Sequence, residues 1–329
     1  MDDHVDWSDD VQDVMVGDLT AAVAYGTPAG GAVVASVSPL GLVDRPTGTV
    51  SFTTSLGFGK KLEHILRNRR LAICYHARTH GFSTSSSLVL AQGIASVDFE
   101  PSTQRLDDLL HRQSPYLGEA KSGPVWDWIL REYHRERVFV DIHVERLVSW
   151  PELSAAGPMS VDGRPMPPAP QPQAPPARGT GPRVDMAKFM KVLGILPHRL
   201  LASLGADGYP VIVPVTPTGW DQDGILLRTP DGPLPPGARR AGLLAHRYNA
   251  QCVGLTVALA TGWLDSSNGT IRYAPHTLHG LSAPPLKTVQ ALGNGMLAKY
   301  GLWQARRQGT LATLHSLAAR TGGAALPHD

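Results

Sequence analysis

A proline-rich segment divides the chain near its middle. Residues 157–183 read GPMSVDGRPMPPAPQPQAPPARGTGPR. Proline fixes φ and has no backbone N–H, so this segment cannot continue a helix or form a central strand. Its composition is typical of an extended linker. We therefore predict a first domain at 1–152, a linker at 153–184 and a second domain at 185–329.

The halves on either side of this segment resemble each other. Three short stretches match in the same order, at offsets of 167 to 170 residues: 34–37 with 201–204, 70–76 with 240–246, and 88–93 with 257–262. A period this long indicates a domain duplication rather than a solenoid. The alignment places His76 and His246 at matching positions, which favours a structural role for both.

Short segments rich in β-branched and aromatic residues, with turn residues between them, predict strands. We expect them at 32–38, 48–55, 70–77, 87–99 and 138–149, and again at 200–205, 209–216, 224–229, 239–247, 254–264 and 270–276. Helical spacing of apolar residues predicts helices at 10–24, 59–69, 102–113, 124–136, 185–195 and 285–308. The first half then has about one expected strand fewer than the second half. The pattern predicts a mainly β fold with helices (α+β), with a small antiparallel β-barrel in each half.

The segment from Val50 to Lys61 carries the most informative chemistry. A strand ends in Thr53-Thr54-Ser55, a glycine-containing loop follows, and a helix opens with Lys60-Lys61. Hydroxyls at a strand end, glycine amides and a helix N-terminus favour an anion such as phosphate, and a lysine adds a full charge. On spacing alone, a strand-turn-helix with solvated lysines remains the alternative.

This region resembles the FMN-binding split barrels related to pyridoxamine 5′-phosphate oxidase. Those proteins carry a strand ending in Thr-(Ser/Asn), a turn, a lysine, a short helix ending in an Asn-x-x-Arg-like stretch, and then a Val/Leu-rich strand. The matching residues here are Thr54-Ser55, Lys61, Arg67-Asn68-Arg69-Arg70, Leu71-Ala72-Ile73-Cys74 and a later strand from Leu88 to Val97. The resemblance covers residues 30–150 and, in its strand pattern, 198–278.

The resemblance implies two split β-barrel domains in tandem, with FMN bound at an interface between two barrels. That interface would be formed within the chain, as a pseudo-dimer, or between two chains, as a homodimer. The cofactor-binding residues that it implies are Thr53, Thr54, Ser55, Lys60, Lys61 and Arg45. A further candidate, His246 of the second repeat, would face the flavin ring across the interface. Thr53, Thr54 and Lys61 would hold the phosphate, Lys60 is the alternative lysine, and Arg45 is the candidate for the family's arginine.

The second half departs from the family pattern. Its segment before Arg240 has no lysine at a helix start, and its prolines exclude a regular helix. We therefore expect at most one complete phosphate site. The C-terminal segment that binds substrate phosphate in the oxidase itself also has no match, so we do not predict pyridoxal phosphate synthesis.

Composition excludes several classes of protein. The net charge is only +2, which argues against a nucleic-acid or membrane partner. Two cysteines, Cys74 and Cys252, cannot form a disulfide framework or a cysteine-rich zinc site, and His276 and His279 lack further ligands, so we expect no metal. The acidic amino terminus is not typical of a signal peptide, and no window predicts a membrane span. We expect a cytoplasmic protein.

The resemblance implies an FMN-dependent oxidoreductase that acts on an unknown small molecule. The flavin would carry the redox chemistry itself, so no catalytic side chain is predicted. Two alternatives stay open. One is the same scaffold with a deazaflavin coenzyme or haem, and the other is a non-catalytic flavin- or ligand-binding protein.

Overall fold

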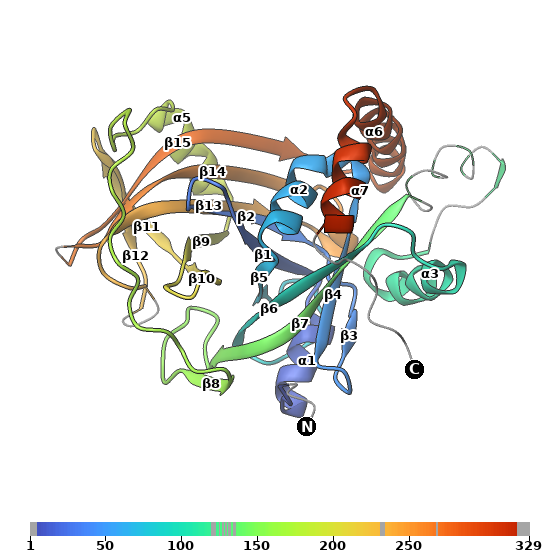
Figure 1. The fold of residues 1–329 in the computed structure, drawn as a ribbon, viewed down its shortest axis with the longest axis horizontal. Helices are drawn as coiled ribbons and strands as arrows, with labels where there is room; N and C mark the ends of the chain where they lie inside the picture. Colours follow the sequence, from blue (N-terminus) through green and yellow to red (C-terminus); the bar gives the residue numbers. More distant parts are fainter. Residues whose placement is uncertain are drawn as a thin grey trace.

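The computed structural model describes residues 5–119, 136–230, 234–267 and 269–320, and single residues between 123 and 133 (Figure 1). Its strands form two antiparallel sheets. The first contains β1 (Thr20–Gly26), β2 (Ala32–Val37), β3 (Val43–Asp44), β4 (Thr49–Ser55), β5 (Arg70–Ala77), β6 (Leu88–Asp98), β7 (Arg137–Trp150) and β8 (Ser160–Gly163). The second contains β9 (His198–Leu204), β10 (Pro210–Pro214), β11 (Thr216–Asp221), β12 (Gly224–Arg228), β13 (Ala238–Arg247), β14 (Thr256–Asp265) and β15 (Ile271–Ser282).

The two sheets repeat one topology. The strand order is β2-β1-β5-β6-β7-β4-β3 in the first, with β8 added to β7, and β10-β9-β13-β14-β15-β12-β11 in the second. The matches of 70–76 with 240–246 and of 88–93 with 257–262 are confirmed, because β5 and β13, and β6 and β14, hold the same places. The match of 34–37 with 201–204 is wrong, because β9 is the counterpart of β1, not of β2.

The segment expected to be a helix over 10–24 forms two elements instead. Helix α1 (Asp9–Gly17) begins after Ser8, whose side chain accepts a hydrogen bond from the Val11 N–H, and β1 follows at Thr20. The first sheet is therefore not short of a strand. The prediction failed because β1 is alanine-rich and buried along its whole length, so it shows no alternation of apolar and polar residues.

The other helices lie close to their expected places. They are α2 (Gly59–Arg67), α3 (Thr103–Leu117), α5 (Met186–Ile195), α6 (Lys287–Arg307) and α7 (Thr310–Arg320), with single 3-10 turns η1 (Leu56–Phe58) and η2 (Ala250–Cys252). Most of the helix expected at 124–136 lies outside the described residues. No helix in the described part of the chain is long and apolar enough to cross a membrane.

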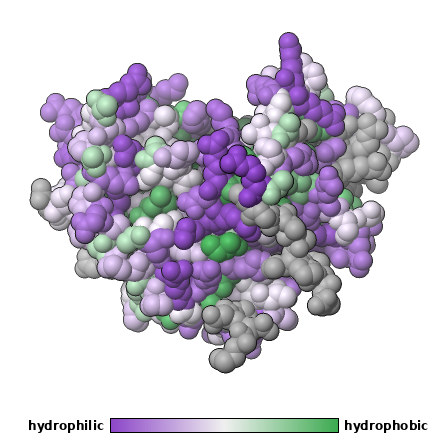
Figure 2. Space-filling view, viewed as in Figure 1, coloured by the Kyte–Doolittle hydropathy of each residue, from purple (hydrophilic) through white to green (hydrophobic). Residues whose placement is uncertain are grey.

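The two sheets pack against each other and share an apolar core. Strand β2 contacts β9, β13 and β14, while β10 contacts β1 and β5. Successive residues of β5 pack into two different apolar cores. Leu71 and Ile73 face the interior of the first half, whereas Ala72 and Cys74 face the second half. The outer face shown in Figure 2 is mainly hydrophilic, with apolar side chains in small separate areas.

The proline-rich segment contacts both halves. Its strand β8 pairs with β7 at the edge of the first sheet, where proline is tolerated on the flanks. Further along, Gln173 donates to the carbonyl oxygen of Gly30 at 2.7 Å and accepts from the N–H of Arg240 at 2.9 Å. The segment therefore connects the two halves and also bridges them; its predicted boundaries stay a prediction.

Candidate functional site

A cavity of about 300 Å³ lies between the two halves of the molecule, and both halves line it. Ser38, Thr53 and Arg137 of the first half form part of one wall. Cys252 of η2 and Lys287 at the start of α6 form part of the other. The volume is at the lower end of the range for small-molecule sites, and such sites commonly lie at domain interfaces.

Two cations lie together at this cavity. Arg137 lines it, and Lys61 of α2 is close enough to Arg137 for the two charges to interact, although Lys61 is not part of the described wall. The Lys61 ammonium lies 5.6 Å from the ring centroid of Phe52 and 5.3 Å from that of Phe58. Burial, and after it the positive charge of Arg137, lowers the pKa of Lys61 to about 8. Within the described part of the chain, neither cation has a carboxylate partner, so the pair favours an anionic ligand.

Strand pairing explains why these groups meet. Strands β4 and β7 are antiparallel, and their register places Ser55 opposite Arg137. The Arg137 guanidinium donates to Thr53 Oγ1 at 3.4 Å, while Thr54 Oγ1 is buried and has no hydrogen-bond partner. Ser55 Oγ accepts from the N–H of Gly57 at 3.2 Å and so caps η1. The end of β4 thus places the Thr53 hydroxyl beside Arg137, whereas the buried Thr54 hydroxyl belongs to the opposite face of the strand.

The N-terminus of α2, which the sequence suggested as an anion-binding helix end, is covered by the C-terminal helices. A Cβ on Gly301 of α6 would lie 2.9 Å from Gly57 Cα, so this position in α6 requires glycine. Gly59 similarly lies against Thr310 of α7. Anion contacts at this corner therefore depend on the side chains of Lys61 and Arg137 more than on helix amides.

The structure does not bring every predicted residue to this cavity. Lys60 is exposed on α2. Arg45 precedes the opposite end of β4, roughly 20 Å from Ser55 at the usual rise of a strand, and pairs with Asp6 at 3.0 Å and Asp9 at 2.6 Å. His246 is fully buried between the sheets and is not part of the described cavity wall.

His246 instead contacts its counterpart in the first half. The Nε2 atoms of His76 and His246 lie 2.7 Å apart, so the two rings share a hydrogen bond. His198 of β9 and Tyr248 pack on the same rings. The equivalence of His76 and His246, expected from the alignment, is confirmed by their places in β5 and β13.

Arg137 and the η2 loop were not among the residues predicted from the sequence. Arg137 stands at the boundary between an expected helix and an expected strand, and only the pairing of β4 with β7 would have placed it beside Thr53. In the loop, Gln251 and Cys252 have φ values of 59° and 56°, which are uncommon for residues other than glycine. Cys252 Sγ lies 3.3 Å from Ser38 Oγ, and burial raises the pKa of the Cys252 thiol to about 11.

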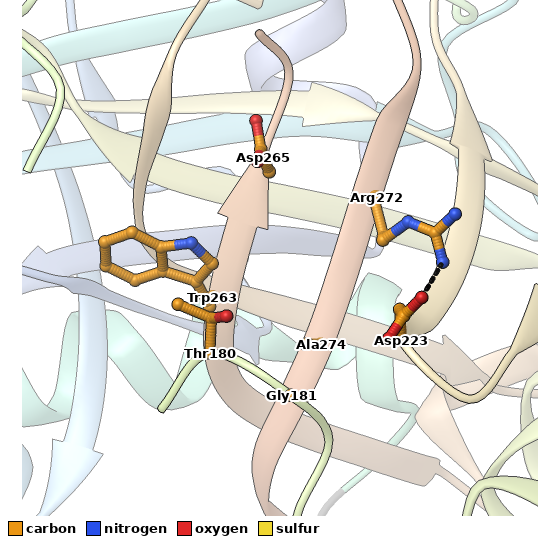
Figure 3. Close-up of a pocket in the computed structure, with 7 residues that line it drawn as sticks. All are labelled: Thr180, Gly181, Asp223, Trp263, Asp265, Arg272 and Ala274. Atoms are coloured by element: carbon orange, nitrogen blue, oxygen red, sulfur yellow. Dashed lines mark ion pairs between the residues drawn. The ribbon is translucent and has the colours of Figure 1, made fainter. Parts of the chain in front are cut away.

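A second cavity, of about 310 Å³, lies over strands β14 and β15 of the second sheet (Figure 3). Thr180 and Gly181 of the proline-rich segment line it, and Thr180 lies beside the ring of Trp263 on β14. Its one lysine or arginine, Arg272, pairs with Asp221 and with Asp223, the latter at 3.9 Å. Because these charges compensate each other, this cavity is a weaker candidate for a phosphate-bearing cofactor.

The second half has no counterpart of the Lys61 site. Between β12 and β13 the described residues form no helix, and the sequence there contains no lysine. Thr229 follows β12 as Thr54 ends β4, and its Oγ1 is likewise buried without a partner. The expectation of at most one complete site stays a prediction.

Comparisons with known proteins gave matches among solved structures alone: no protein-family model and no curated protein matches the chain. A conserved hypothetical protein from Mycobacterium tuberculosis matches 50% of this chain and 96% of its own, at 19% identity and a TM-score of 0.35. A Clostridium acetobutylicum protein related to general stress protein 26, of the pyridoxinephosphate oxidase family, matches 44% and 84%, at 7% identity and 0.30. A pyridoxamine 5′-phosphate oxidase-related, FMN binding protein from Nostoc punctiforme matches 60% and 87%, at 10% identity and 0.28.

Each of these matches covers most of the smaller protein and about half of this chain. The chain is thus similar to proteins related to pyridoxamine 5′-phosphate oxidase over about half of its length at a time.

Proposed function

We propose that the chain is an FMN-dependent oxidoreductase, similar to pyridoxamine 5′-phosphate oxidase in fold, that acts on a small molecule. Its halves would be two split barrels that pair as a pseudo-dimer and hold one flavin in the cavity between them. The observation that supports this most is the pair Lys61 and Arg137, two cations to which the described residues offer no carboxylate partner, next to a cavity that both halves line.

The residues at the end of β4 fit the phosphate of FMN. Lys61 and Arg137 would neutralise its charge, and Thr53 would donate a hydrogen bond to it. Thr54 belongs to the opposite face of β4 and is not part of the described cavity wall, so Thr53 is the threonine that would contact the phosphate.

The opposite wall would complete the site. Cys252 is a neutral thiol held by Ser38, so it presents an uncharged surface to the flavin ring. Bound FMN supplies the hydride- or electron-transfer chemistry itself. The protein's task is then to hold the phosphate and to keep water away from one side of the ring.

The alternatives use the same cavity. A deazaflavin coenzyme also carries phosphate and would be held by Lys61 and Arg137. Haem is less favoured, because no histidine is part of the described cavity wall. A non-catalytic flavin-binding protein would have the same contacts and differ only in showing no turnover.

Removing either cation should weaken FMN binding. We expect Lys61→Met and Arg137→Met each to cost about 1.5–3 kcal/mol, the usual range for a hydrogen bond to a charged group, which is roughly a 10- to 150-fold rise in Kd. Methionine at position 61 keeps an apolar side chain near the rings of Phe52 and Phe58. Titration of FMN fluorescence measures the effect, and Lys60→Met, at the exposed neighbouring lysine, should leave Kd unchanged.

Riboflavin, which lacks the phosphate, provides the control for this experiment. The unaltered protein should bind FMN more tightly than riboflavin, and the Lys61→Met protein should lose most of that preference. Equal affinity of the unaltered protein for FMN and riboflavin would contradict the proposed phosphate site. Failure to bind any flavin would contradict the proposed cofactor.

The lowered pKa of Lys61 predicts a pH dependence. In the free protein the ammonium is charged below about pH 8 and loses its proton above it. The FMN phosphate stays doubly charged over this range. Kd for FMN should therefore rise by up to about tenfold for each pH unit above 8, while Kd for riboflavin stays flat. The Lys61→Met protein should show no such rise.

A further inference from the structure

Helix α6 presents an apolar stripe to solvent. The stripe consists of Val289, Leu292, Met296, Tyr300 and Trp303, which are 44–59% exposed. Successive members are three or four residues apart, so all five lie on one face of the helix. We call this face the outer stripe. Exposed apolar residues scattered singly need no explanation, but five on one helix face do.

The other face of α6 is already in use. Ala298, Leu302 and Ala305 are buried, and Leu302 belongs to the core of the first half. Helix α6 is therefore apolar on both faces, a pattern typical of helices that are covered on all sides. Two further exposed aromatic residues lie next to it: Phe58 in η1, and Trp128, whose ring centroid is 3.5 Å from Lys299 Nζ.

Helices α6 and α7 carry charge of one sign. Residues 266–328 contain no aspartate or glutamate. Helices α6 and α7 carry five cations: Lys287, Lys299, Arg306, Arg307 and Arg320. The guanidinium of Arg307 lies 5.3 Å from the Trp303 ring centroid, at the end of the stripe.

One group of acidic residues lies far from α6. Asp9, Asp10 and Asp13 belong to α1, which Figure 1 shows at the opposite end of the molecule from α6. The net charge of +2 conceals this separation. A molecule charged in this way orients its α6 end toward a negative surface.

These observations disfavour a second copy of the chain as the partner. An antiparallel pair of α6 helices would bring Lys287 near Arg306, and a parallel pair would bring Lys299 near its own copy. Neither arrangement supplies an acidic residue. A single helix face is also small beside the roughly 800 Å² that each partner buries in a standard interface.

We infer that the outer stripe docks on the surface of an anionic lipid membrane. Leu292 and Met296 would enter the apolar boundary, with Tyr300 and Trp303 at the level of the headgroups, where aromatic side chains are favoured. The flanking cations would contact the lipid phosphates. This inference revises the expectation, drawn from net charge, that the protein has no membrane partner.

Sedimentation with lipid vesicles tests the inference. The full-length protein should bind vesicles of equal phosphatidylcholine and phosphatidylglycerol at least tenfold more tightly than vesicles of phosphatidylcholine alone, and 0.5 M NaCl should weaken that binding. Trp303→Glu should reduce binding at least tenfold. Trp220→Glu is the matched control, because Trp220 is 47% exposed on β11 in the second half. The Trp220→Glu protein should bind vesicles as the unaltered protein does.

Three results would overturn the inference. The first is no binding to the phosphatidylglycerol vesicles at low salt, and the second is an equal effect of Trp303→Glu and Trp220→Glu. The third is a dimer in light scattering that Trp303→Glu dissociates while vesicles stay unbound, which would assign the stripe to a second copy. If Trp303→Glu lowers the melting temperature, Met296→Glu replaces it, since Met296 is 58% exposed.

Discussion

Replacement of Arg146 by methionine is expected to lower the free energy of unfolding by about 3–5 kcal/mol, the usual cost of breaking a buried ion pair. Arg146 lies on β7 and is 2% exposed. Its guanidinium pairs with Asp207 at 2.6 Å and donates to Gln92 Oε1 at 2.7 Å. It also donates to the carbonyl oxygens of Arg164 and Pro165, at 2.9 and 2.8 Å.

These partners come from three parts of the chain, which is why the effect should be large. Gln92 belongs to the first sheet, Arg164 and Pro165 to the proline-rich segment, and Asp207 to the turn between β9 and β10. Gln92 also donates to the carbonyl oxygen of Pro210 at 2.6 Å. Methionine would leave a poorly solvated carboxylate and two carbonyl groups without their donor.

Urea unfolding of full-length proteins measures this cost. Arg164→Met is the matched control, because Arg164 pairs with Glu145 at 3.2 Å while about half exposed, and such pairs contribute about 0–1 kcal/mol. The double variant Arg146→Met/Asp207→Leu should be less destabilised than Arg146→Met alone, since it removes the unpaired carboxylate. Equal costs for Arg146→Met and Arg164→Met would contradict the assignment of Arg146 as the bridge between the halves.

The contacts of Arg146 were not predictable from the sequence of the proline-rich segment, although the absence of a helix there was. Its prolines correctly excluded a helix, and its strand β8 stands at a sheet edge. Its contacts with Arg146 and Arg240 depend on backbone carbonyl groups and on Gln173, which carry no pattern in the sequence. We expect deletion of 160–178 to destabilise the protein rather than to be neutral.

The duplication was predictable because β5, β6 and their counterparts keep similar apolar patterns. Strand β1 was not, because a fully buried, alanine-rich strand lacks the period of two that distinguishes a strand from a helix. The missed strand also misaligned 34–37 with 201–204. Local errors of this kind come from tertiary burial, which overrides propensity.

The candidate site was predictable in part. A strand end, a loop and a helix close in sequence place Thr53 and Lys61 near each other, as local contacts do. Arg137 joins them only through the β4–β7 pairing, across 84 residues from Thr53. Likewise, the repeat shows that His76 and His246 correspond, but not that the two side chains meet.

That histidine pair predicts the second large effect, a loss of stability in mild acid. His76 Nδ1 lies 3.1 Å from the carbonyl oxygen of Cys74, which needs a donor, so Nδ1 of His76 carries the proton. His76 Nε2 then accepts from His246 Nε2. This assignment leaves His246 Nδ1 unprotonated, and that atom is buried without a partner.

A further proton has no favourable place on either ring. On His76 Nε2 it would face the N–H of His246, and on His246 Nδ1 it would find no acceptor. Burial lowers the pKa of His76 to about 3, and the positive charges of His198 and Arg78 act in the same direction. Burial, with the charges of His76 and His198, also holds the pKa of His246 well below its usual value.

The lowered pKa values of His76 and His246 determine how the stability of the fold changes with pH. In the unfolded chain a histidine takes up a proton near pH 6.5, whereas the folded protein keeps His76 neutral to about pH 3. The unfolded state therefore binds more protons, and stability falls as pH falls below 6.5. His76 alone should cost about 2 kcal/mol between pH 6.5 and 5, and His246 adds to this loss.

Comparison with the double variant His76→Gln/His246→Gln isolates the pair, because the two amides can bond to each other but do not titrate. The comparison is needed because burial raises the pKa of Asp18 to about 7, which acts in the opposite direction over this range. Urea unfolding at several pH values should show the unaltered protein losing at least about 2 kcal/mol relative to the variant from pH 6.5 to 5. His279→Gln, at an exposed position on β15, should follow the unaltered protein. If the free energy of unfolding changes with pH in the same way in the unaltered protein and the double variant, the buried histidine pair is not the cause of the loss of stability in acid.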